Sequence, residues 1–258
     1  MLPDINPGLI LLVGGLLVPL VRGALRHVWL LGLPALALAV LIDLPHGVSG
    51  QVTIMGQTLE TLRVDSLSFV FSLIFLIAAL LMAVYALHLR DTMQHVAGMV
   101  YAGAAVAACL AGDLLTLFIY WELTAVASVF LIWARRTERA YRVGMRYLLI
   151  PVASGLLLLA GAAVQAQENG ALSFGHLGLD APGGWLIFLA FGIKCAFPLL
   201  HNWLQDAYPE ATVTGTVVLS AFTTKLAVYA LARGYAGTEH LIWIGALMTA
   251  FPNFYAVI

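Results

Sequence analysis

Charged residues are scarce in this sequence. Asp, Glu, Lys and Arg make up 10% of the 258 residues, whereas ordinary soluble domains carry about 25%. Hydrophobic residues make up 62%, so the composition excludes an ordinary soluble domain and predicts a membrane protein. The formal net charge is -1, and no cluster of basic residues is interleaved with aromatics. These two observations argue against nucleic acid as a partner.

Cysteine is also scarce, and the sequence motifs of redox cofactors are missing. The two cysteines, Cys109 and Cys195, both fall in apolar segments, which argues against a disulfide framework or a metal site. The sequence has no G-x-G-x-x-G signature of nucleotide binding, no cysteine cluster and no evident pair of intramembrane histidines. We therefore predict no cofactor and no metal in this chain.

Long apolar runs dominate what is present. A helix needs about 20 residues to cross the hydrocarbon core, and the intervals between these runs are too short for a separate soluble domain. The sequence therefore predicts an all-α polytopic membrane protein with about nine transmembrane helices. These helices are expected at about residues 8–24, 28–44, 65–89, 95–111, 114–134, 142–166, 184–204, 212–233 and 240–258.

The interval at 45–64 differs from the other connections. Its apolar residues alternate with polar ones on either side of Met55 and Gly56, and they are Val52, Ile54, Leu59 and Leu62. Period-two alternation about a short turn is typical of paired strands. We therefore predict a small β-hairpin on the membrane surface, between the second and third helices.

The arginines predict how the chain is oriented, because short cytoplasmic loops carry an excess of Lys and Arg. With the N-terminus outside, the external loops hold Arg63 and Arg233. The internal loops then hold the remaining arginines, which are Arg22, Arg26, Arg90, Arg135, Arg136, Arg139, Arg142 and Arg146. We expect the N-terminus outside and the C-terminus near the cytoplasmic face of the cell inner (plasma) membrane.

Lysine is the rarest charged residue. The only two lysines, Lys194 and Lys225, both lie in apolar segments, so neither is expected on the surface. Together with Glu122 they are three ionisable residues near the middle of predicted spans. A charge at the bilayer centre costs at least about 2.5–3.5 kcal/mol, so such residues usually face the bundle interior and mark ion paths or proton relays.

The stretch FGIKCAFPLLHNWLQDAYPE at 191–210 combines a lysine, a proline and a histidine. On an unbroken helix, Lys194, Pro198, His201 and Gln205 would share one face. Pro198 has no N–H and clashes with the carbonyl four residues before it. Inside a membrane, a broken helix is tolerated only where protein or a water-filled cavity satisfies the freed backbone. The stretch therefore predicts a broken helix with a hydrated, titratable gap.

Glu122, Lys194, Lys225 and His201 are predicted to form a proton relay. A buried amine holds its proton when it is paired with a carboxylate and releases it when left alone. If Glu122 approaches and withdraws, Lys194 can pass its proton toward Lys225 on the next helix. His201 can relay in either state, because histidine titrates near pH 6.5, about the middle of the physiological range.

These residues also have structural interpretations. Glu122 and a lysine could form a static ion pair that fixes helix packing. His201 could be no more than a hydrogen-bonding residue at a helix end. Asp113 stands where one helix ends and the next begins, which favours N-capping over transport.

Three phrases of the sequence resemble a known family. They are GDLLTLFIYWEL at 112–123, FGIKCAFPLLHNWLQDAYPEA at 191–211 and SAFTTKLAVYALARG at 220–234. They are similar to the proton-translocating, antiporter-like subunits shared by respiratory complex I and Mrp-type cation/proton antiporters, and the third phrase looks most like the D-type subunits of Mrp antiporters. The resemblance implies that Glu122 is the carboxylate partner, Lys194 the lysine of the broken helix and Lys225 the connecting lysine. It also implies that His201 is the histidine of the broken-helix motif.

The chain departs from that family in two ways. Gln205 stands where the family commonly has proline, and the family usually has about fourteen spans built from two inverted repeats. By this resemblance, 1–90 is an N-terminal three-helix segment, 91–235 a five-helix proton-channel repeat, and 236–258 the first helix of a missing second repeat. Three explanations stay open: a second polypeptide supplies that repeat, the chain is a fragment, or the subunit is a scaffold that has lost pumping.

The resemblance implies a transport subunit rather than an enzyme. The leading hypothesis is half of a proton channel in a multisubunit Na+/H+ antiporter-like complex. The alternatives are a membrane-arm subunit of a complex I-like quinone oxidoreductase or hydrogenase, and a non-pumping structural subunit. Expected partners are other integral membrane subunits, lipids and protons, with Na+ as the candidate exchanged ion.

Overall fold

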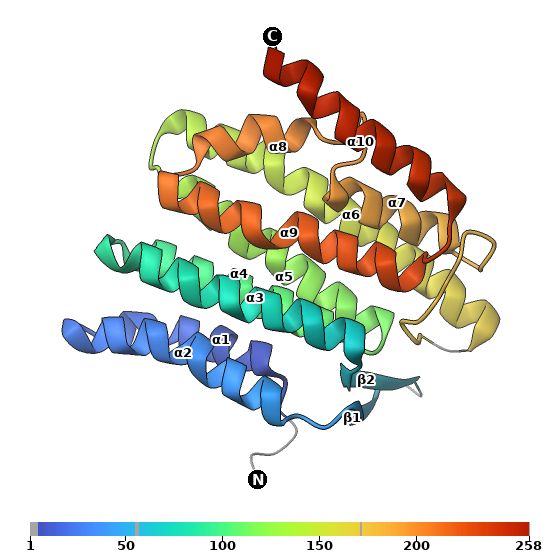
Figure 1. Ribbon diagram of the computed structural model, residues 1–258, viewed down its shortest axis with the longest axis horizontal. Coiled ribbons are helices and arrows are strands. Elements are labelled where there is room, and N and C mark those ends of the chain that lie inside the picture. Colours follow the sequence, from blue (N-terminus) through green and yellow to red (C-terminus); the bar gives the residue numbers. More distant parts are fainter. Residues whose placement is uncertain (1–4, 55–56, 171, 258) are drawn as a thin grey trace.

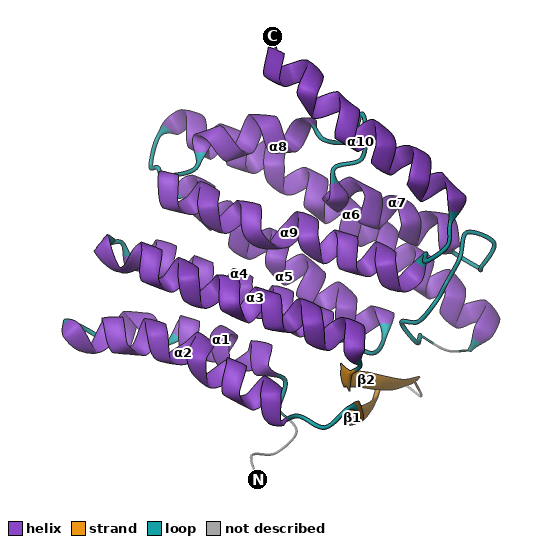
Figure 2. Cartoon of the chain, in the orientation of Figure 1, coloured by secondary structure: helices purple, strands orange, loops and turns teal. Residues whose placement is uncertain are grey.

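The computed structural model describes residues 5–54, 57–170 and 172–257, which fold into a bundle of helices with one β-hairpin (Figures 1 and 2). The first five helices are α1 (Pro7–Leu16), α2 (Ala24–Asp43), α3 (Ser66–Tyr85), α4 (Thr92–Cys109) and α5 (Leu114–Trp133). They are followed by α6 (Glu138–Asn169), α7 (Gly184–Cys195), α8 (Asn202–Ala207), α9 (Val213–Gly234) and α10 (Glu239–Val257).

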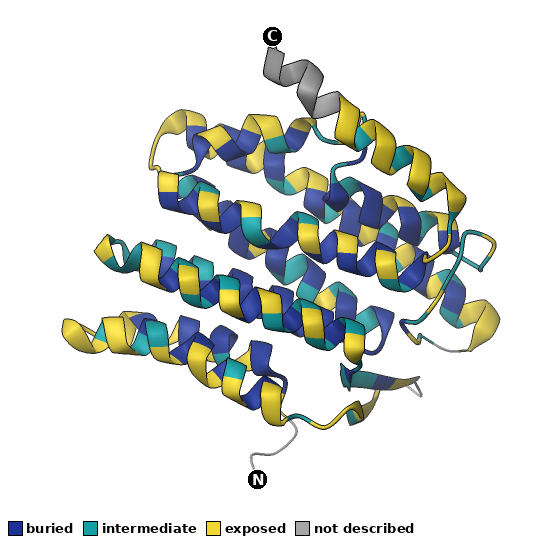
Figure 3. Cartoon of the chain, in the orientation of Figure 1, coloured by how far each residue is buried: buried dark blue, intermediate teal, exposed yellow. Residues whose placement is uncertain are grey.

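Within the described ranges, 5 helices are long and apolar enough to cross a membrane, and these are α2, α3 with its short extension to His88, α5, α6 and α9. Helices α1 and α7 are apolar but shorter. Exposed positions lie along the helices of the bundle (Figure 3). They include large apolar side chains such as Leu81 and Leu149, which lipid would cover. The all-α membrane class is confirmed, while the count of about nine spans stays a prediction.

The predicted hairpin is present between α2 and α3. Strands β1 (Gly47–Ile54) and β2 (Gln57–Val64) pair antiparallel, with Val52 opposite Leu59. The predicted turn residues, Met55 and Gly56, lie outside the described residues. Leu59 and Leu62 are both buried although residues three apart in a strand point to opposite faces, so the alternation does not divide the hairpin into one buried and one exposed face.

The hairpin docks on the connection between α4 and α5. The Arg63 N–H donates to the Leu110 carbonyl at 2.7 Å, and the Gly112 N–H donates to the Glu60 carbonyl at 2.9 Å. The Asp113 carboxylate accepts from the Glu60 N–H at 2.9 Å and from the Thr116 N–H at 2.7 Å. Asp113 is therefore the N-cap of α5, as predicted, and it also anchors β2.

Arg233 of α9 binds the residue that begins α3. Its guanidinium lies 2.7 Å from the carboxylate of Asp65, which N-caps α3 just before the membrane span. Burial alone would raise the pKa of Asp65. The hydrogen bonds from Arg233 and the Ser68 N–H, with the charges of Arg233 and Arg63, instead lower this pKa to about 2. The carboxylate is thus ionised at neutral pH and holds α3 and α9 together on this side.

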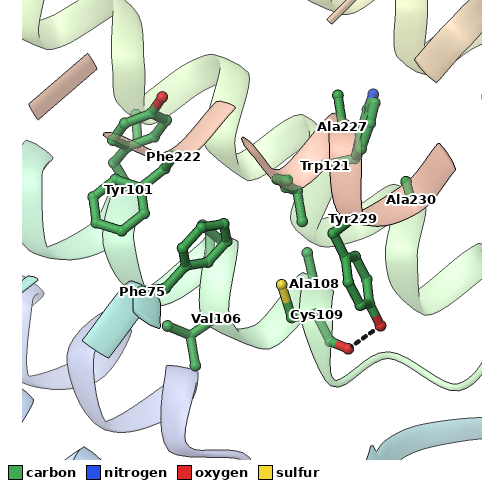
Figure 4. Close-up of a cluster of buried hydrophobic side chains, with 14 of the residues drawn as sticks. Phe75, Tyr101, Val106, Ala108, Cys109, Trp121, Phe222, Ala227, Tyr229 and Ala230 are labelled. Carbon is green, nitrogen blue, oxygen red and sulfur yellow. Dashed lines mark hydrogen bonds between the residues drawn. The ribbon is translucent and has the colours of Figure 1, made fainter. Parts of the chain in front are cut away.

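Helix α4 lies at the centre of the bundle, and small residues let its neighbours approach closely. A Cβ added at Gly103 would lie 2.7 Å from the Gly8 carbonyl oxygen, so α1 and α4 are in backbone contact there. Aromatic rings fill the space toward α3 and α9, where Phe75 and Tyr101 each meet Phe222 at 5.3 Å between ring centroids (Figure 4). This rigid centre fixes α5 and α9, the helices that carry Glu122 and Lys225.

Candidate functional site

The helix that carries Lys194 is broken, as Pro198 predicted. Helix α7 ends at Cys195 and α8 begins at Asn202. Between them Ala196 has φ 62° and Leu199 has φ 70°, left-handed conformations that are uncommon for residues other than glycine. Such backbone persists only where its surroundings hold it in place, which is typical of functional segments.

The predicted continuous polar face does not form across this break. Six residues without α-helical structure separate α7 from α8, so Lys194 and Gln205 belong to different helices. The interruption removes the constant 3.6-residue period on which the prediction relied. His201 stands immediately before α8, and its carbonyl accepts the Leu204 N–H at 3.0 Å. Its role in a relay stays a prediction.

Lys194 points into the bundle toward α5. Its side chain is 1% exposed, and its Nζ donates to the Trp121 carbonyl and to Thr124 Oγ1, the latter at 3.1 Å. The same Nζ lies 4.3 Å from the centroid of the Trp121 ring, a cation–π distance. Among the described residues, the groups that contact this amine are thus a carbonyl, a hydroxyl and an aromatic ring, all of them neutral.

Glu122 lies beside these contacts on the same helix. Its side chain is half-buried, and its Oε1 is buried with no hydrogen-bond partner in the described part of the chain. The carboxylate and the Lys194 amine interact through their charges, but the ion pairs among the described residues do not include this pair. The arrangement here differs from the static ion pair that the sequence left open. A buried carboxylate oxygen without a partner is costly, and such groups mark functional sites.

Gly155 of α6 makes room for that carboxylate. A Cβ added at Gly155 would lie 2.5 Å from Cδ of Glu122 and 3.2 Å from its Cγ. These distances are far below ordinary van der Waals contact, so only glycine at this position leaves the glutamate in its place. Sequence reasoning missed Gly155, because the contact joins two helices.

Lys225 corrects the expectation that no lysine lies on the surface. It is exposed on α9, and its Nζ donates to the Ser220 carbonyl at 2.7 Å. The inner face of α9 is occupied instead by Phe222 and by Thr223, whose N–H donates to the Tyr101 hydroxyl at 3.0 Å. Hydropathy places a residue in a span but does not say which side of the helix faces a neighbour, which is why the prediction failed.

Two further residues join the site to its surroundings. Ser154 of α6 donates to the Ala190 carbonyl of α7 at 2.7 Å and accepts the Trp121 indole N–H at 3.1 Å. The Trp203 indole N–H of α8 donates to the Ile193 carbonyl at 3.1 Å, which links the two halves of the broken helix. For Ser154, the sequence signal was a polar serine within an apolar segment. Sequence reasoning did not assign a role to either.

The arrangement provides one buried amine, a carboxylate that forms no ion pair with it, and a second, exposed amine on α9. Among the described residues, no group of three or more His, Cys, Asp or Glu side chains could hold a metal ion. Carboxylate and amine side chains such as Glu122 and Lys194 can each bind and release a proton.

The chain is similar to known membrane proteins. The family described as NADH:quinone oxidoreductase/Mrp antiporter, transmembrane, matches residues 111–251. Hydrogenase-4 component B of Escherichia coli (strain K12) is 26% identical over 211 residues, covering 74% of this chain and 31% of that protein. The D component of the Na(+)/H(+) antiporter of Bacillus subtilis (strain 168) is 28% identical over 163 residues, covering 56% of this chain and 33% of that protein.

The fold is also found in a solved complex. A chain of respiratory complex I from Thermus thermophilus superposes with a TM-score of 0.77 at 22% identity, covering 97% of this chain and 58% of that chain. The present chain spans about a third of the length of the two curated relatives. The matched segment 111–251 includes Glu122, Lys194 and Lys225.

Proposed function

The chain belongs to the NADH:quinone oxidoreductase/Mrp antiporter transmembrane family, and from this premise we propose that it is a proton-translocating subunit of a larger membrane complex. It contributes half of an ion channel, in which protons pass along Glu122, Lys194 and Lys225, with His201 at the break. Other subunits carry any redox chemistry. The conformational change that moves protons is the approach and withdrawal of Glu122 from Lys194.

The observation that carries the proposal is the position of Lys194. A fully buried amine at the end of a broken helix, held by a carbonyl, a hydroxyl and an aromatic ring, is costly as a cation unless a negative charge compensates it. Glu122, which follows Trp121 in the chain, supplies that negative charge. Because Glu122 and Lys194 form no ion pair, a small shift of α5 against α7 changes their interaction and hence the proton occupancy of Lys194.

Exposed Lys225 supports a partner on the outer side of α9. A lysine on the lipid-facing side of a membrane helix is disfavoured, so this side chain needs another protein surface against it. We assign that surface to another integral membrane subunit of the complex. In this scheme residues 1–90 precede the channel repeat at 91–235, and 236–258 begins the contact with the partner.

The parent complex is proposed to be a Mrp-type antiporter that exchanges Na+ for protons in the cell inner (plasma) membrane. The chain crosses about nine times, with α7 and α8 as one broken span. The N-terminus lies outside and the C-terminus near the cytoplasmic face, as the arginine-rich loops favour.

A complex I-like oxidoreductase or a hydrogenase is the second candidate. The observation in its favour is that the similarity to hydrogenase-4 component B covers 74% of this chain. Subunits that copurify with the chain, identified by mass spectrometry, distinguish the two. Iron–sulfur or flavin subunits indicate a redox complex, and cation/proton antiporter subunits alone indicate the Mrp type.

Replacing Glu122 by glutamine tests the proposal. This change keeps the shape of the side chain and removes its charge, so proton flux should fall about tenfold, the effect of losing an interaction of about 1.4 kcal/mol. Flux is measured with a pH-sensitive dye in liposomes that contain the assembled complex. The matched control is Glu168→Gln, at an exposed position on α6, which should leave flux unchanged. Normal flux in an assembled Glu122→Gln complex would reject the relay and leave a structural subunit.

Replacing Gly155 by alanine tests the placement of Glu122 without touching its charge. The new methyl group displaces the carboxylate, so flux should fall about fivefold to tenfold, as for a partial loss of the same interaction. Adding Glu122→Asp should restore part of the flux, because the shorter side chain leaves space for the methyl. Gly32→Ala on α2 is the control, since an added Cβ there meets nothing within 4 Å. Equal flux in the two alanine variants would contradict this placement.

A further inference from the structure

An apolar groove crosses the outer surface of the bundle where α1, α4 and α5 meet. Its volume is about 480 Å³, within the range of about 300–1,000 Å³ that is usual for ligand sites. Val126 and Phe130 of α5 and Leu16 of α1 are exposed along it, while Ala97 of α4 forms part of its floor. The groove is separate from the site of Lys194, whose contacts lie inside the bundle.

A polar pocket adjoins one end of this groove. Its lining includes Arg90, Asp91 and Arg136, and Thr92 lines both the pocket and the groove. The groove therefore ends beside Arg90 and Arg136. Arg26 reaches the same place, with its guanidinium 3.3 Å from Thr92 Oγ1.

The pocket carries a net positive charge. Asp91 forms an ion pair with Arg136 at 3.2 Å, and that contact holds the guanidinium over the pocket. Arg90 is in none of the ion pairs found in the described ranges. One carboxylate thus faces two arginines in the pocket lining, with Arg26 beside them. A guanidinium has five N–H donors, so Arg136 can bind an anion while it stays paired with Asp91.

The backbone at Arg136 is an independent sign that this position is specialised. Arg136 follows the end of α5 with φ 57°, in the left-handed region that helix C-termini usually fill with glycine. An arginine there is strained, and it places a guanidinium at the mouth of the pocket. Strained residues of this kind cluster at binding and functional sites.

The length of the groove decides what can fill it. Along α4 it runs from Thr92 to Val100, and the eight steps between these residues rise about 12 Å in a helix. The hydrocarbon core is about 30 Å thick, so the groove is about as deep as one leaflet. A transmembrane helix of a partner would need a groove through both leaflets. An acyl chain that enters from the arginine end needs only one.

We propose that this groove and the adjoining arginine pocket form a binding site for an anionic phospholipid. Its phosphate lies between Arg90 and Arg136, and one acyl chain lies along α4 and α5. Guanidinium groups suit a phosphate because they can donate two parallel hydrogen bonds to it. Basic pockets at the ends of transmembrane helices recognise lipid headgroups by the same chemistry.

Lipid titration of the detergent-solubilised complex, followed by native mass spectrometry, tests the headgroup contact. Dioleoyl phosphatidylglycerol should bind about 25-fold more weakly to the Arg90→Gln, Arg136→Gln double variant, since each arginine contributes about a factor of five. Arg142→Gln is the matched control, because Arg142 is an exposed arginine near the start of α6 that pairs with Glu138 outside the pocket. The proposal would be overturned if Arg142→Gln weakened phosphatidylglycerol binding as much as the double variant does. It would also be overturned if the wild type bound dioleoyl phosphatidylcholine as tightly as dioleoyl phosphatidylglycerol.

A bulky side chain placed in the groove tests whether an acyl chain binds there. Val126→Trp should weaken phosphatidylglycerol binding about tenfold, whereas Val84→Trp, on the exposed face of α3 and outside the groove lining, should not. A benzophenone side chain at position 126 should cross-link to lipid in the assembled complex. A cross-link to another protein subunit instead would show that a partner occupies the groove and would refute the lipid assignment.

Discussion

Replacing Lys194 by methionine should abolish proton flux through the assembled complex while leaving the subunit folded. Positioned proton-transfer groups contribute factors of about 10²–10⁴, so flux should fall at least about a hundredfold. Methionine fills the volume of the lysine stem but cannot carry a proton. No other amine lies in the contact that Lys194 makes with α5, because Lys225 is exposed on α9.

The subunit should keep its stability because the contacts that remain are satisfied. Thr124 Oγ1 already donates to the Trp121 carbonyl at 2.7 Å, so loss of the amine leaves neither group without a partner. Removing one partner of a buried ion pair is destabilising when it leaves the other charge buried and uncompensated, but Glu122 is only half-buried and is not in an ion pair with Lys194, so this cost should be small. The melting temperature of the complex should therefore change little.

The measurement compares flux and melting temperature in the same preparation. Leu200→Met, at a partly exposed position within the same break, controls for the introduction of methionine at this site and should transport normally. A Lys194→Met complex that retains more than half of wild-type flux would eliminate Lys194 as a proton carrier. A complex that loses flux only because it melts earlier would show a structural role for the lysine.

The sequence predicted the features that depend on local chemistry. Pro198 indicated the break, because proline removes a donor and clashes with the preceding turn wherever the helix lies. The pattern of apolar and polar residues on either side of Met55 and Gly56 indicated a hairpin, since strand periodicity is a local property. Asp113 was correctly assigned as a helix cap for the same reason.

The features that the sequence did not predict depend on contacts between distant residues. The space that Gly155 leaves for Glu122 exists only when α5 and α6 are in contact. The hydrogen bond from Ser154 to the Ala190 carbonyl joins residues 36 apart, and no periodicity encodes it. The exposure of Lys225 follows from which side of α9 meets the aromatic cluster around Tyr101. The rarity of charge in apolar segments and the family resemblance both pointed to Glu122, Lys194 and Lys225, but neither predicted their geometry.

Trp121 is the residue whose loss should cost the most stability. Its side chain is 0% exposed, its ring lies 5.2 Å from that of Phe191, and its indole N–H binds Ser154. It therefore joins α5 to both α6 and α7. Replacement of a buried tryptophan by alanine costs about 3–5 kcal/mol in soluble cores through lost contacts and the cavity left behind.

The cost of Trp121→Ala in a membrane should lie near the lower end of that range, at about 3 kcal/mol, because lipid also solvates the ring in the unfolded state. At about 2–4 °C per kcal/mol, the melting temperature should fall by roughly 10 °C. Trp243→Ala is the matched control, since Trp243 on α10 is 69% exposed, and it should change melting by little. Trp121→Phe should lie between the two, because it keeps a ring beneath Lys194 and loses only the indole N–H and part of the volume. If Trp121→Ala melts like the control, α5, α6 and α7 are held together by other contacts, and the rigid support that Lys194 needs for proton transfer must come from elsewhere.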